Sequence, residues 1–304
     1  MGASGDAEGT FDGAVAGVVA VTGPTGNVGA EVVRHLLAAG APVRTLSRHP
    51  DGARAWLGDE AEHGRFVFGD AATYPVAFDG VEALFLMRPP QIADVARRIH
   101  PAIDAARAAG VRRIAFLSLQ GVERNPVVPH HRIERHLRQS GIPTTYLRPS
   151  FFMQNLSTTH REEIRRDGEL FVPAGRGRTA FVDARDVAEV VAKVLVQPGH
   201  EGRAYELTGR EAPTYVEVAE VLTEVLGRRV TYADPTPWTF WRRHRDRGTP
   251  AAFVMVMLGL YTVARLGLAG SVTPDLERLL GRPPTTLRDF VADHADAWRA
   301  TVQG

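Results

Sequence analysis

Residues 17–40 read GVVAVTGPTGNVGAEVVRHLLAAG, in which a short apolar run is followed at once by a glycine-rich turn and a helical pattern. The run at 17–22 is rich in β-branched residues, which is typical of a buried parallel strand. Residues 28–39 place apolar side chains at helical spacing, and Gly40 stands where a helix C-cap belongs. Strand, turn and helix in this order predict the opening of a βαβ unit.

The turn has the spacing G-x-x-G-x-x-G rather than the more familiar G-x-G-x-x-G. Glycine turns are common in α/β folds, but here the turn lies where a strand becomes a helix, so backbone amides and the helix N-terminus can face a pyrophosphate. The sequence therefore predicts a dinucleotide-binding turn whose contact residues are Gly23, Thr25, Gly26, Asn27, Val28 and Gly29.

The alternation of strands and helices continues along the first half of the chain. Further strands are predicted at 42–48, 65–70, 81–87, 112–119 and 142–148, with helices at 91–109 and 129–140. Such alternation indicates a parallel sheet covered by helices on both faces. We therefore predict the α/β fold class, with a doubly wound parallel sheet of Rossmann type and a smaller, largely helical C-terminal substrate lobe.

The regular alternation of strands and helices becomes looser beyond Pro149, and this change defines the expected domains. We expect a disordered tail at 1–16, a cofactor-binding core at 17–150, and a substrate lobe at 151–304 in which 177–209 returns to the sheet. Residues 214–298 read as mostly helical, with one strand at 230–234. Asp183 or Asp186 is expected to cap the helix that follows, and a catalytic role is the alternative.

Composition narrows the function classes. The 304 residues carry 36 lysine and arginine against 35 aspartate and glutamate, so no basic surface for nucleic acid or an anionic membrane is expected. The longest apolar stretch, 251–264, is shorter than the ~20 residues that cross a bilayer. The chain has no cysteine, which excludes disulfides and thiolate chemistry, and its histidines show no metal-ligand spacing. We expect a cytoplasmic protein without a metal site.

The end of the second predicted strand bears on the choice of cofactor. An acidic side chain there would bind the ribose 2′-hydroxyl of NAD, but no carboxylate occurs before Asp51. Arg48, assisted by Ser47 or Arg44, could instead hold a 2′-phosphate through charge-assisted hydrogen bonds. A solvated arginine is the alternative. The missing acid favours NADP(H) over NAD(H).

Several stretches together resemble the NmrA-like branch of the atypical short-chain dehydrogenase/reductase family. They are GPTGNVG, the strand-end Arg48, Gly69-Asp70, IAFLSL at 114–119, IERHLRQSGIPTTYLRPSFFMQN at 133–155 and GELFVPAGRGRTAFVDARDVA at 168–188. The resemblance covers about residues 17–300. It implies that Asp70 lies near the adenine, Met87, Arg88 and Pro89 near the ribose, Ser118 at the mouth of the fifth strand, and Pro149, Ser150, Phe151 and Phe152 on the nicotinamide side.

The sequence departs from the broader family at its catalytic pair. Most short-chain reductases use Tyr-x-x-x-Lys, but the single lysine here is Lys193, and His130 and Pro126 take the places of the lysine and the tyrosine. His130 could donate a proton near neutral pH, and Ser118 is the second catalytic candidate. A surface histidine at a helix start is the alternative interpretation of His130.

Two functions are compatible with the lost pair. In one, hydride passes from the nicotinamide to a small-molecule acceptor that needs little acid help, as in quinone, azo or iminium reductases related to this branch. In the other, the protein binds the dinucleotide as a redox sensor and reports to a regulatory protein partner. A pocket with aromatic and methionine walls favours the reductase, and ordinary core of the helical lobe is the alternative; the wall residues are Phe151, Phe152, Met153, Trp238, Phe240, Trp241 and the apolar run 250–267. The predicted substrate contacts are Phe152, Trp238, Trp241 and Asn155, which could order the loop over the cofactor or make a structural hydrogen bond. A homodimer is compatible with either function.

Overall fold

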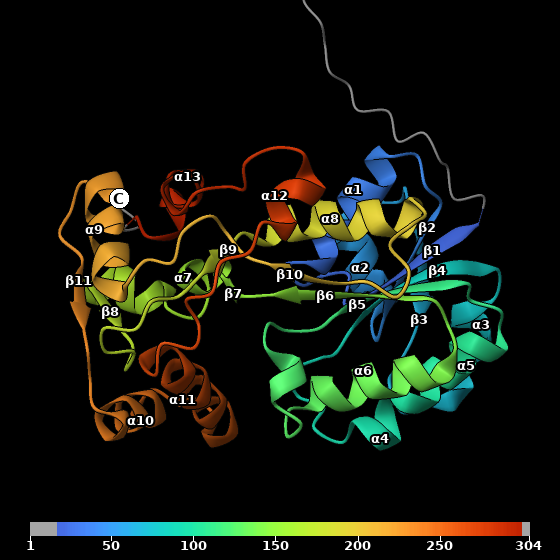
Figure 1. Cartoon of the computed structure of the whole chain (residues 1–304), viewed down its shortest axis with the longest axis horizontal. Helices are drawn as coiled ribbons and strands as arrows, with labels where there is room; N and C mark the ends of the chain where they lie inside the picture. The colour runs from blue at the N-terminus through green and yellow to red at the C-terminus, as the bar shows by residue number, and fades with distance from the viewer. Residues whose placement is uncertain (1–16, 300–304) are drawn as a thin grey trace, which may run out of the picture. The chain divides into compact units, whose positions relative to one another are not determined.

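The computed structural model describes residues 17–299, which form two compact units (Figure 1). The expected tail at 1–16 lies outside the described residues. The chain passes between the units three times, so each unit is assembled from separate stretches. Unit 1 contains residues 17–148 and 188–205, and unit 2 contains residues 149–187 and 206–299.

Unit 1 is built on a seven-stranded sheet of order β10-β6-β5-β4-β1-β2-β3. The strands are β1 (Val18–Thr22), β2 (Val43–Ser47), β3 (Glu62–Arg65), β4 (Val81–Met87), β5 (Arg113–Leu117), β6 (Thr144–Pro149) and β10 (Ala204–Leu207). The five pairings from β3 to β6 are all parallel. The predicted Rossmann-type sheet is confirmed, and β1 occupies the switch point at which the strand order reverses.

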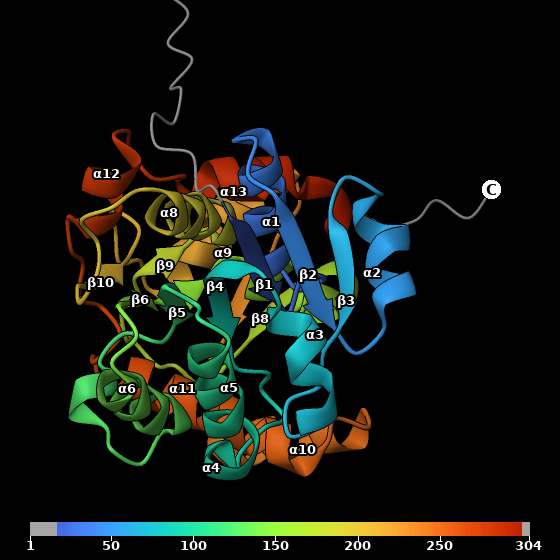
Figure 2. The same cartoon turned by 90° about the vertical axis from the view of Figure 1, so that its right-hand side faces the viewer.

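Helices cover both faces of this sheet (Figure 2). On one face lie α1 (Gly29–Ala38) and the part of α8 (Ala184–Val196) that belongs to unit 1, and on the other lie α4 (Val95–Arg98), α5 (His100–Ala108) and α6 (Pro129–Ser140). The buried apolar residues of α5 and α6, such as Ile103 and Leu137, share one core with Leu84 and Phe116 of the sheet. Burial of this continuous apolar surface supplies most of the driving force for folding.

Two predicted elements of unit 1 were wrong. The predicted strand at 65–70 ends at Arg65, because Phe66 and Phe68 turn inward to an aromatic cluster and Gly69 adopts a φ of +88°. The predicted helix at 91–109 is two helices, α4 and α5. Pro101 lies in the first turn of α5, where its missing amide hydrogen is tolerated. In the middle of one continuous helix over 91–109 the same proline would remove a hydrogen bond and break the helix.

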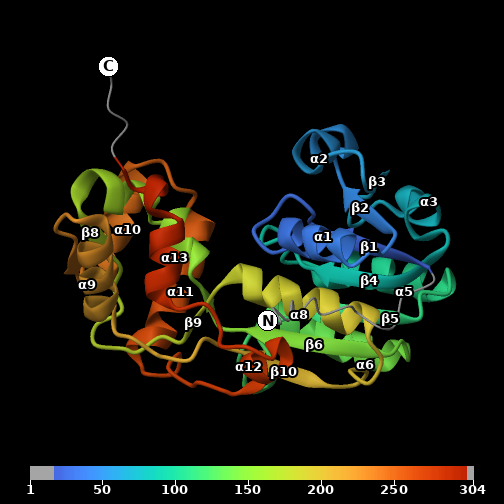
Figure 3. The same ribbon diagram turned by 90° about the horizontal axis from the view of Figure 1, so that it is seen from above.

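Unit 2 is mostly helical, as predicted (Figure 3). Its helices are α7 (Gln154–Ser157), α9 (Tyr215–Leu226), α10 (Pro237–Asp246), α11 (Ala251–Arg265), α12 (Asp275–Leu280) and α13 (Leu287–Asp293). Two small parallel pairs complete it, β7 (Phe151–Phe152) with β9 (Phe181–Val182) and β8 (Glu169–Phe171) with β11 (Thr231–Ala233). Within residues 17–299, every helix is too short or too polar to cross a bilayer.

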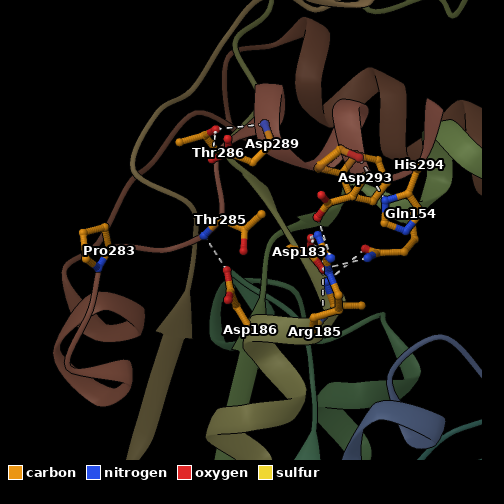
Figure 4. Close-up of polar contacts among 12 residues, drawn as sticks. Gln154, Asp183, Arg185, Asp186, Pro283, Thr285, Thr286, Asp289, Asp293 and His294 are labelled. Atoms are coloured by element: carbon orange, nitrogen blue, oxygen red, sulfur yellow. Dashed lines mark hydrogen bonds and ion pairs between the residues drawn. The ribbon is translucent and has the colours of Figure 1, made fainter. Parts of the chain in front are cut away.

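Asp183 caps α8 and ties three segments of unit 2 together (Figure 4). Its carboxylate accepts the amide of Arg185 and the side-chain amide of Gln154, each at 2.8 Å, and it forms an ion pair with the Arg185 guanidinium. Arg185 also reaches Asp293 at 2.7 Å. These partners account fully for a buried carboxylate, so the capping interpretation is confirmed for Asp183.

Asp186 is the second buried carboxylate near the start of α8, and it holds the loop before α13 (Figure 4). It accepts the Thr285 amide at 2.6 Å and the Arg282 guanidinium at 2.8 Å. Both donors come from the far end of the sequence, so this carboxylate fixes a long-range contact within unit 2.

We expect Asp186→Ala to lower the free energy of unfolding by about 1–3 kcal/mol, because the Thr285 amide loses its acceptor and a buried site is left without its charge. Urea unfolding followed by circular dichroism would measure the loss. Glu224→Ala is the matched control, because it removes an exposed partner of Arg288 and should change the same free energy by less than about 1 kcal/mol. Equal losses in the two variants would contradict the role given to Asp186.

Candidate cofactor site

The glycine turn after β1 closes tightly onto the start of α1. Gly23 has a φ of +63°, and its carbonyl accepts the Gly26 amide at 3.1 Å. A Cβ atom on Gly29 would lie 2.1 Å from the Gly23 carbonyl oxygen, so no side chain fits there. The spacing G-x-x-G-x-x-G therefore has a steric cause at two of its three glycines.

The turn is held at the edge of the sheet by Thr22, the last residue of β1. The Thr22 hydroxyl donates to the carbonyl of Phe85 at 3.0 Å and accepts the amide of Met87 at 2.8 Å, so the ends of β1 and β4 are fixed at one level. The Met87 side chain then lies against Gly23. One side of the turn is thereby filled by the protein itself.

The opposite side of the turn is suited to an anion. Helix α1 begins at Gly29, and its N-cap residue, Val28, provides no side-chain cap. The Ala30 amide is bonded to the Gly26 carbonyl at 3.0 Å, and the other amides of the first turn need an acceptor, which the helix dipole favours as a negative charge. Thr25, Asn27 and Val28 all lie in this segment, so the residues present fit the pyrophosphate of a dinucleotide.

The end of β2 presents Ser47 and Arg48. The Ser47 hydroxyl is buried and has no hydrogen-bond partner among the described residues. Arg48 follows it, is exposed, and forms no ion pair within residues 17–299. Arg44, the alternative to Ser47 as the helper of Arg48, has other partners: its guanidinium donates to Glu62 at 2.7 Å and to the Asp79 carbonyl at 2.6 Å.

Arg88 follows β4 and is folded back on its own loop. One of its terminal nitrogens donates to three carbonyls, including that of Ile92 at 2.7 Å, while its Nε is buried without a partner in the described part of the chain. Burial lowers the pKa of Arg88. Pro89 continues this loop, and Asp70 lies after β3, where one carboxylate oxygen accepts the Ala72 amide at 3.2 Å. Arg88 thus offers an unsatisfied donor close to the end of β4.

Ser118 belongs to a buried charged network that the sequence analysis did not find. Its hydroxyl donates to Glu134 of α6 at 2.7 Å, and Arg148 of β6 donates to both oxygens of the same carboxylate, at 3.1 and 2.8 Å. Arg138 and Glu123 extend the network. Glu134 lies between buried Ile133 and buried Leu137 on α6. A carboxylate on the apolar side of a helix indicates a buried polar contact, and this pattern could have identified the network from the sequence.

His130 begins the same helix and is partly buried, not a surface residue. Burial, reinforced by the positive charge of Arg88, lowers the pKa of His130 to about 3. Its Nδ1 is buried without a hydrogen-bond partner among the described residues. The ring is therefore neutral at pH 7, which argues against an imidazolium acid and leaves it a hydrogen-bonding role.

The predicted residues of unit 2 come from four elements. Ser150 follows β6, and its hydroxyl is buried without a partner in the described residues; Phe151 and Phe152 form β7. Asn155 lies in α7, while α10 carries the half-buried Trp241 and Trp238, which is 69% exposed. A cavity of about 730 Å³ in this unit is lined by other residues, among them Met153, Arg178, Phe181 and Leu287.

The chain is similar to known proteins along almost its whole length. A model of the NmrA-like family matches residues 16–254. An NAD(P)H azoreductase of Xenophilus azovorans is 32% identical over 289 residues, which are 93% of this chain and 100% of that protein.

Two solved structures share the fold closely. The NADPH-dependent quinone oxidoreductase of Escherichia coli, complexed with NADPH, has a TM-score of 0.83 at 30% identity, covering 90% of this chain and 99% of that one. The triphenylmethane reductase of Citrobacter sp., complexed with NADP(H), has a TM-score of 0.82 at 27% identity, covering 91% and 99%.

The lowered pKa of His130 predicts an acid-sensitive stability. The unfolded chain takes up a proton on this ring near pH 6.5, whereas the folded chain does not until about pH 3, so stability is lost as the pH falls between these values, at up to about 1.4 kcal/mol per pH unit. We expect His130→Gln to make the decline shallower. Urea unfolding at several pH values from neutral to mildly acidic would measure it, and identical slopes for both proteins would contradict the buried neutral ring.

Proposed function

Because the chain belongs to the NmrA-like family and is an NAD(P)H-dependent reductase, we propose that it prefers NADPH and reduces a small aromatic, quinone-like or imine acceptor. The observation that carries the proposal is the glycine turn with its uncapped helix, beside a β2 end that lacks a carboxylate. The relatives named as azoreductase, quinone oxidoreductase and triphenylmethane reductase support an acceptor of this kind.

The preference for NADPH rests on Ser47 and Arg48. A 2′-phosphate at the end of β2 would accept from the unpartnered Ser47 hydroxyl and pair with the exposed Arg48 guanidinium. A 2′-hydroxyl would find no carboxylate to bind it, since the nearest acid along the chain is Asp51. The site is therefore better matched to a phosphate than to a hydroxyl.

The kind of acceptor follows from the state of the two candidate proton donors, Ser118 and His130. The hydroxyl proton of Ser118 is committed to Glu134, and the ring of His130 is neutral at pH 7. Bound NADPH supplies the hydride. A quinone reduced this way becomes a hydroquinone with one further proton, which we propose comes from solvent. Acceptors that stabilise negative charge by conjugation suit a site without a strong protein acid.

We propose that the N-terminal half of the chain binds the cofactor and the C-terminal half binds the acceptor. Residues 17–150 would hold the dinucleotide, with Asp70 toward the adenine and Met87, Arg88 and Pro89 toward the ribose. Phe152, Asn155, Trp238 and Trp241, in residues 151–304, would contact the acceptor. Pro149, Ser150 and Phe151, where the two halves of the chain join, would lie on the nicotinamide side. Aromatic side chains suit a planar acceptor because they stack on it.

A cofactor-sensing regulator is the second candidate. The observation that favours it is the same lack of a free acid, because Ser118 and His130 are both explained by burial and packing. Such a protein would bind NADP(H), leave it unchanged and present a different surface to a protein partner.

Turnover separates the two candidates. NADPH and NADH oxidation, followed at roughly 340 nm, would be measured with a panel of quinones, azo dyes, triphenylmethane dyes and cyclic imines, beside calorimetric binding of both cofactors. We expect NADPH to be consumed with at least one acceptor class and to bind more tightly than NADH. Tight binding without turnover on the whole panel would overturn the reductase proposal in favour of the sensor.

The cofactor preference has its own test. We expect Arg48→Glu to weaken NADPH binding by about ten- to a hundredfold, the equivalent of one charge-assisted hydrogen bond of about 1.5–3 kcal/mol, and to change NADH binding little. Arg54→Glu on α2 (Pro50–Leu57) is the matched control, because it makes the same charge change at another exposed position. An equal loss of both cofactors in Arg48→Glu would contradict the proposal.

A further inference from the structure

The buried charged network around Glu134 lies at the carboxyl edge of the large sheet. Ser118 directly follows β5, Arg148 is the last residue but one of β6, and Glu134 reaches both from α6. Parallel sheets of this kind bind their ligands outside the carboxyl ends of the strands. The network therefore fixes two strand ends at the edge where a ligand is expected.

The carboxylate of Glu134 is saturated within the described part of the chain. One oxygen accepts the Ser118 hydroxyl at 2.7 Å and the Arg148 Nε at 3.1 Å, and the other accepts Arg148 Nη2 at 2.8 Å and Arg138 at 3.0 Å. A carboxylate has about four acceptor positions, so these donors fill it. With 4% of the Glu134 side chain exposed, water has little access to compete for them.

Stability alone does not explain such a network. Two carboxylates, of Glu123 and Glu134, are balanced by two guanidiniums, of Arg138 and Arg148. The desolvation of buried ion pairs offsets much of their attraction, and apolar residues of similar volume often stabilise a core as well. The network adds orientation, because a bidentate arginine and a saturated carboxylate fix the positions of the groups bound to them.

This orientation has its clearest effect on Ser118, because a hydroxyl has one proton and two lone pairs. The Ser118 proton is donated to Glu134, and no described residue donates to the Ser118 oxygen. The backbone is occupied too, since the Ser118 amide donates to the Leu147 carbonyl at 2.7 Å. Ser118 can therefore bind a ligand through its side chain only by accepting a hydrogen bond.

We propose that Glu134 is a positioning residue, which holds Ser118 as a hydrogen-bond acceptor for the carboxamide amino group of the nicotinamide. The inference rests on the proposed cofactor and does not need turnover. The carboxamide carries the N–H donors of the nicotinamide ring, and a bond to one of them would fix the rotation of that ring. The ribose hydroxyls can instead accept, and the buried Nε of Arg88, at the end of the neighbouring β4, is a donor without a partner among the described residues.

Calorimetric binding of two oxidised cofactors tests the acceptor role of Ser118. The probes are NADP+ and its 3-acetylpyridine analogue, in which a methyl ketone replaces the carboxamide and leaves no N–H. We expect Ser118→Ala to weaken NADP+ binding about three- to tenfold, as for the loss of one neutral hydrogen bond, and to leave binding of the analogue unchanged. Ser140→Ala is the matched control, because it removes another buried hydroxyl of unit 1, which donates to the Leu137 carbonyl, and it should change neither affinity.

The positioning role of Glu134 is tested by the same two probes. We expect Glu134→Gln to lower the NADP+ affinity as Ser118→Ala does, again without effect on the analogue. The double variant Ser118→Ala/Glu134→Gln should bind NADP+ no more weakly than Ser118→Ala alone, because Glu134 acts through Ser118. Glu134→Asp, which withdraws the carboxylate by one methylene, takes the place of Glu134→Gln if that variant does not fold.

Three results would overturn the inference: equal losses of NADP+ and of the analogue in Ser118→Ala, an unchanged NADP+ affinity in either single variant, or additive losses in the double variant. Wild-type protein that binds neither probe would overturn both this inference and the proposed cofactor. The first three results leave NADP+ binding by the wild-type protein intact, so the two failures are distinguishable whether or not an acceptor is reduced.

Discussion

The cofactor end of unit 1 depends on one close contact, the approach of Gly29 to the carbonyl oxygen of Gly23. The space between them admits no side chain, and this lets the six residues from Gly23 to Val28 fold into a tight turn between β1 and α1. Thr22 fixes the end of β1 to β4 by two hydrogen bonds, and Met87 fills the inner side of the turn. The rest of the turn offers backbone amides and the polar side chains of Thr25 and Asn27, which suit an anion.

The fold was largely predictable from sequence because most of its strands and helices have simple local patterns. Buried strands such as 17–22 and 81–87 are recognisable because they are apolar throughout, and the order of strands and helices fixes the parallel sheet. The exceptions have local causes. Phe66 and Phe68 alternate like strand residues, yet they alternate because both enter an aromatic cluster after the strand has ended. Pro101 divides a continuous helical pattern in two.

The candidate site was less predictable, because its chemistry depends on contacts between residues far apart in the chain. The glycines could be identified from spacing alone, but the commitment of Arg44 to Glu62 depends on how β2 and β3 pair. Likewise, Glu134 becomes important only because Ser118 and Arg148 arrive beside it from two neighbouring strands. For His130, residue type suggested a group that titrates near neutrality, while its burial makes it a neutral ring.

The interleaving of the two units also has a consequence for synthesis of the chain. The strand that completes the large sheet, β10, is made about 55 residues after β6, the strand it adjoins, and the intervening stretch includes residues 149–187 of unit 2. A nascent chain that has just left the ribosome as far as β6 therefore presents an open sheet edge, and such edges are where unwanted pairing with other chains begins. Unit 1 can be completed only after residues 149–187 of unit 2 have been made, so this inserted stretch must be accommodated before the sheet is finished.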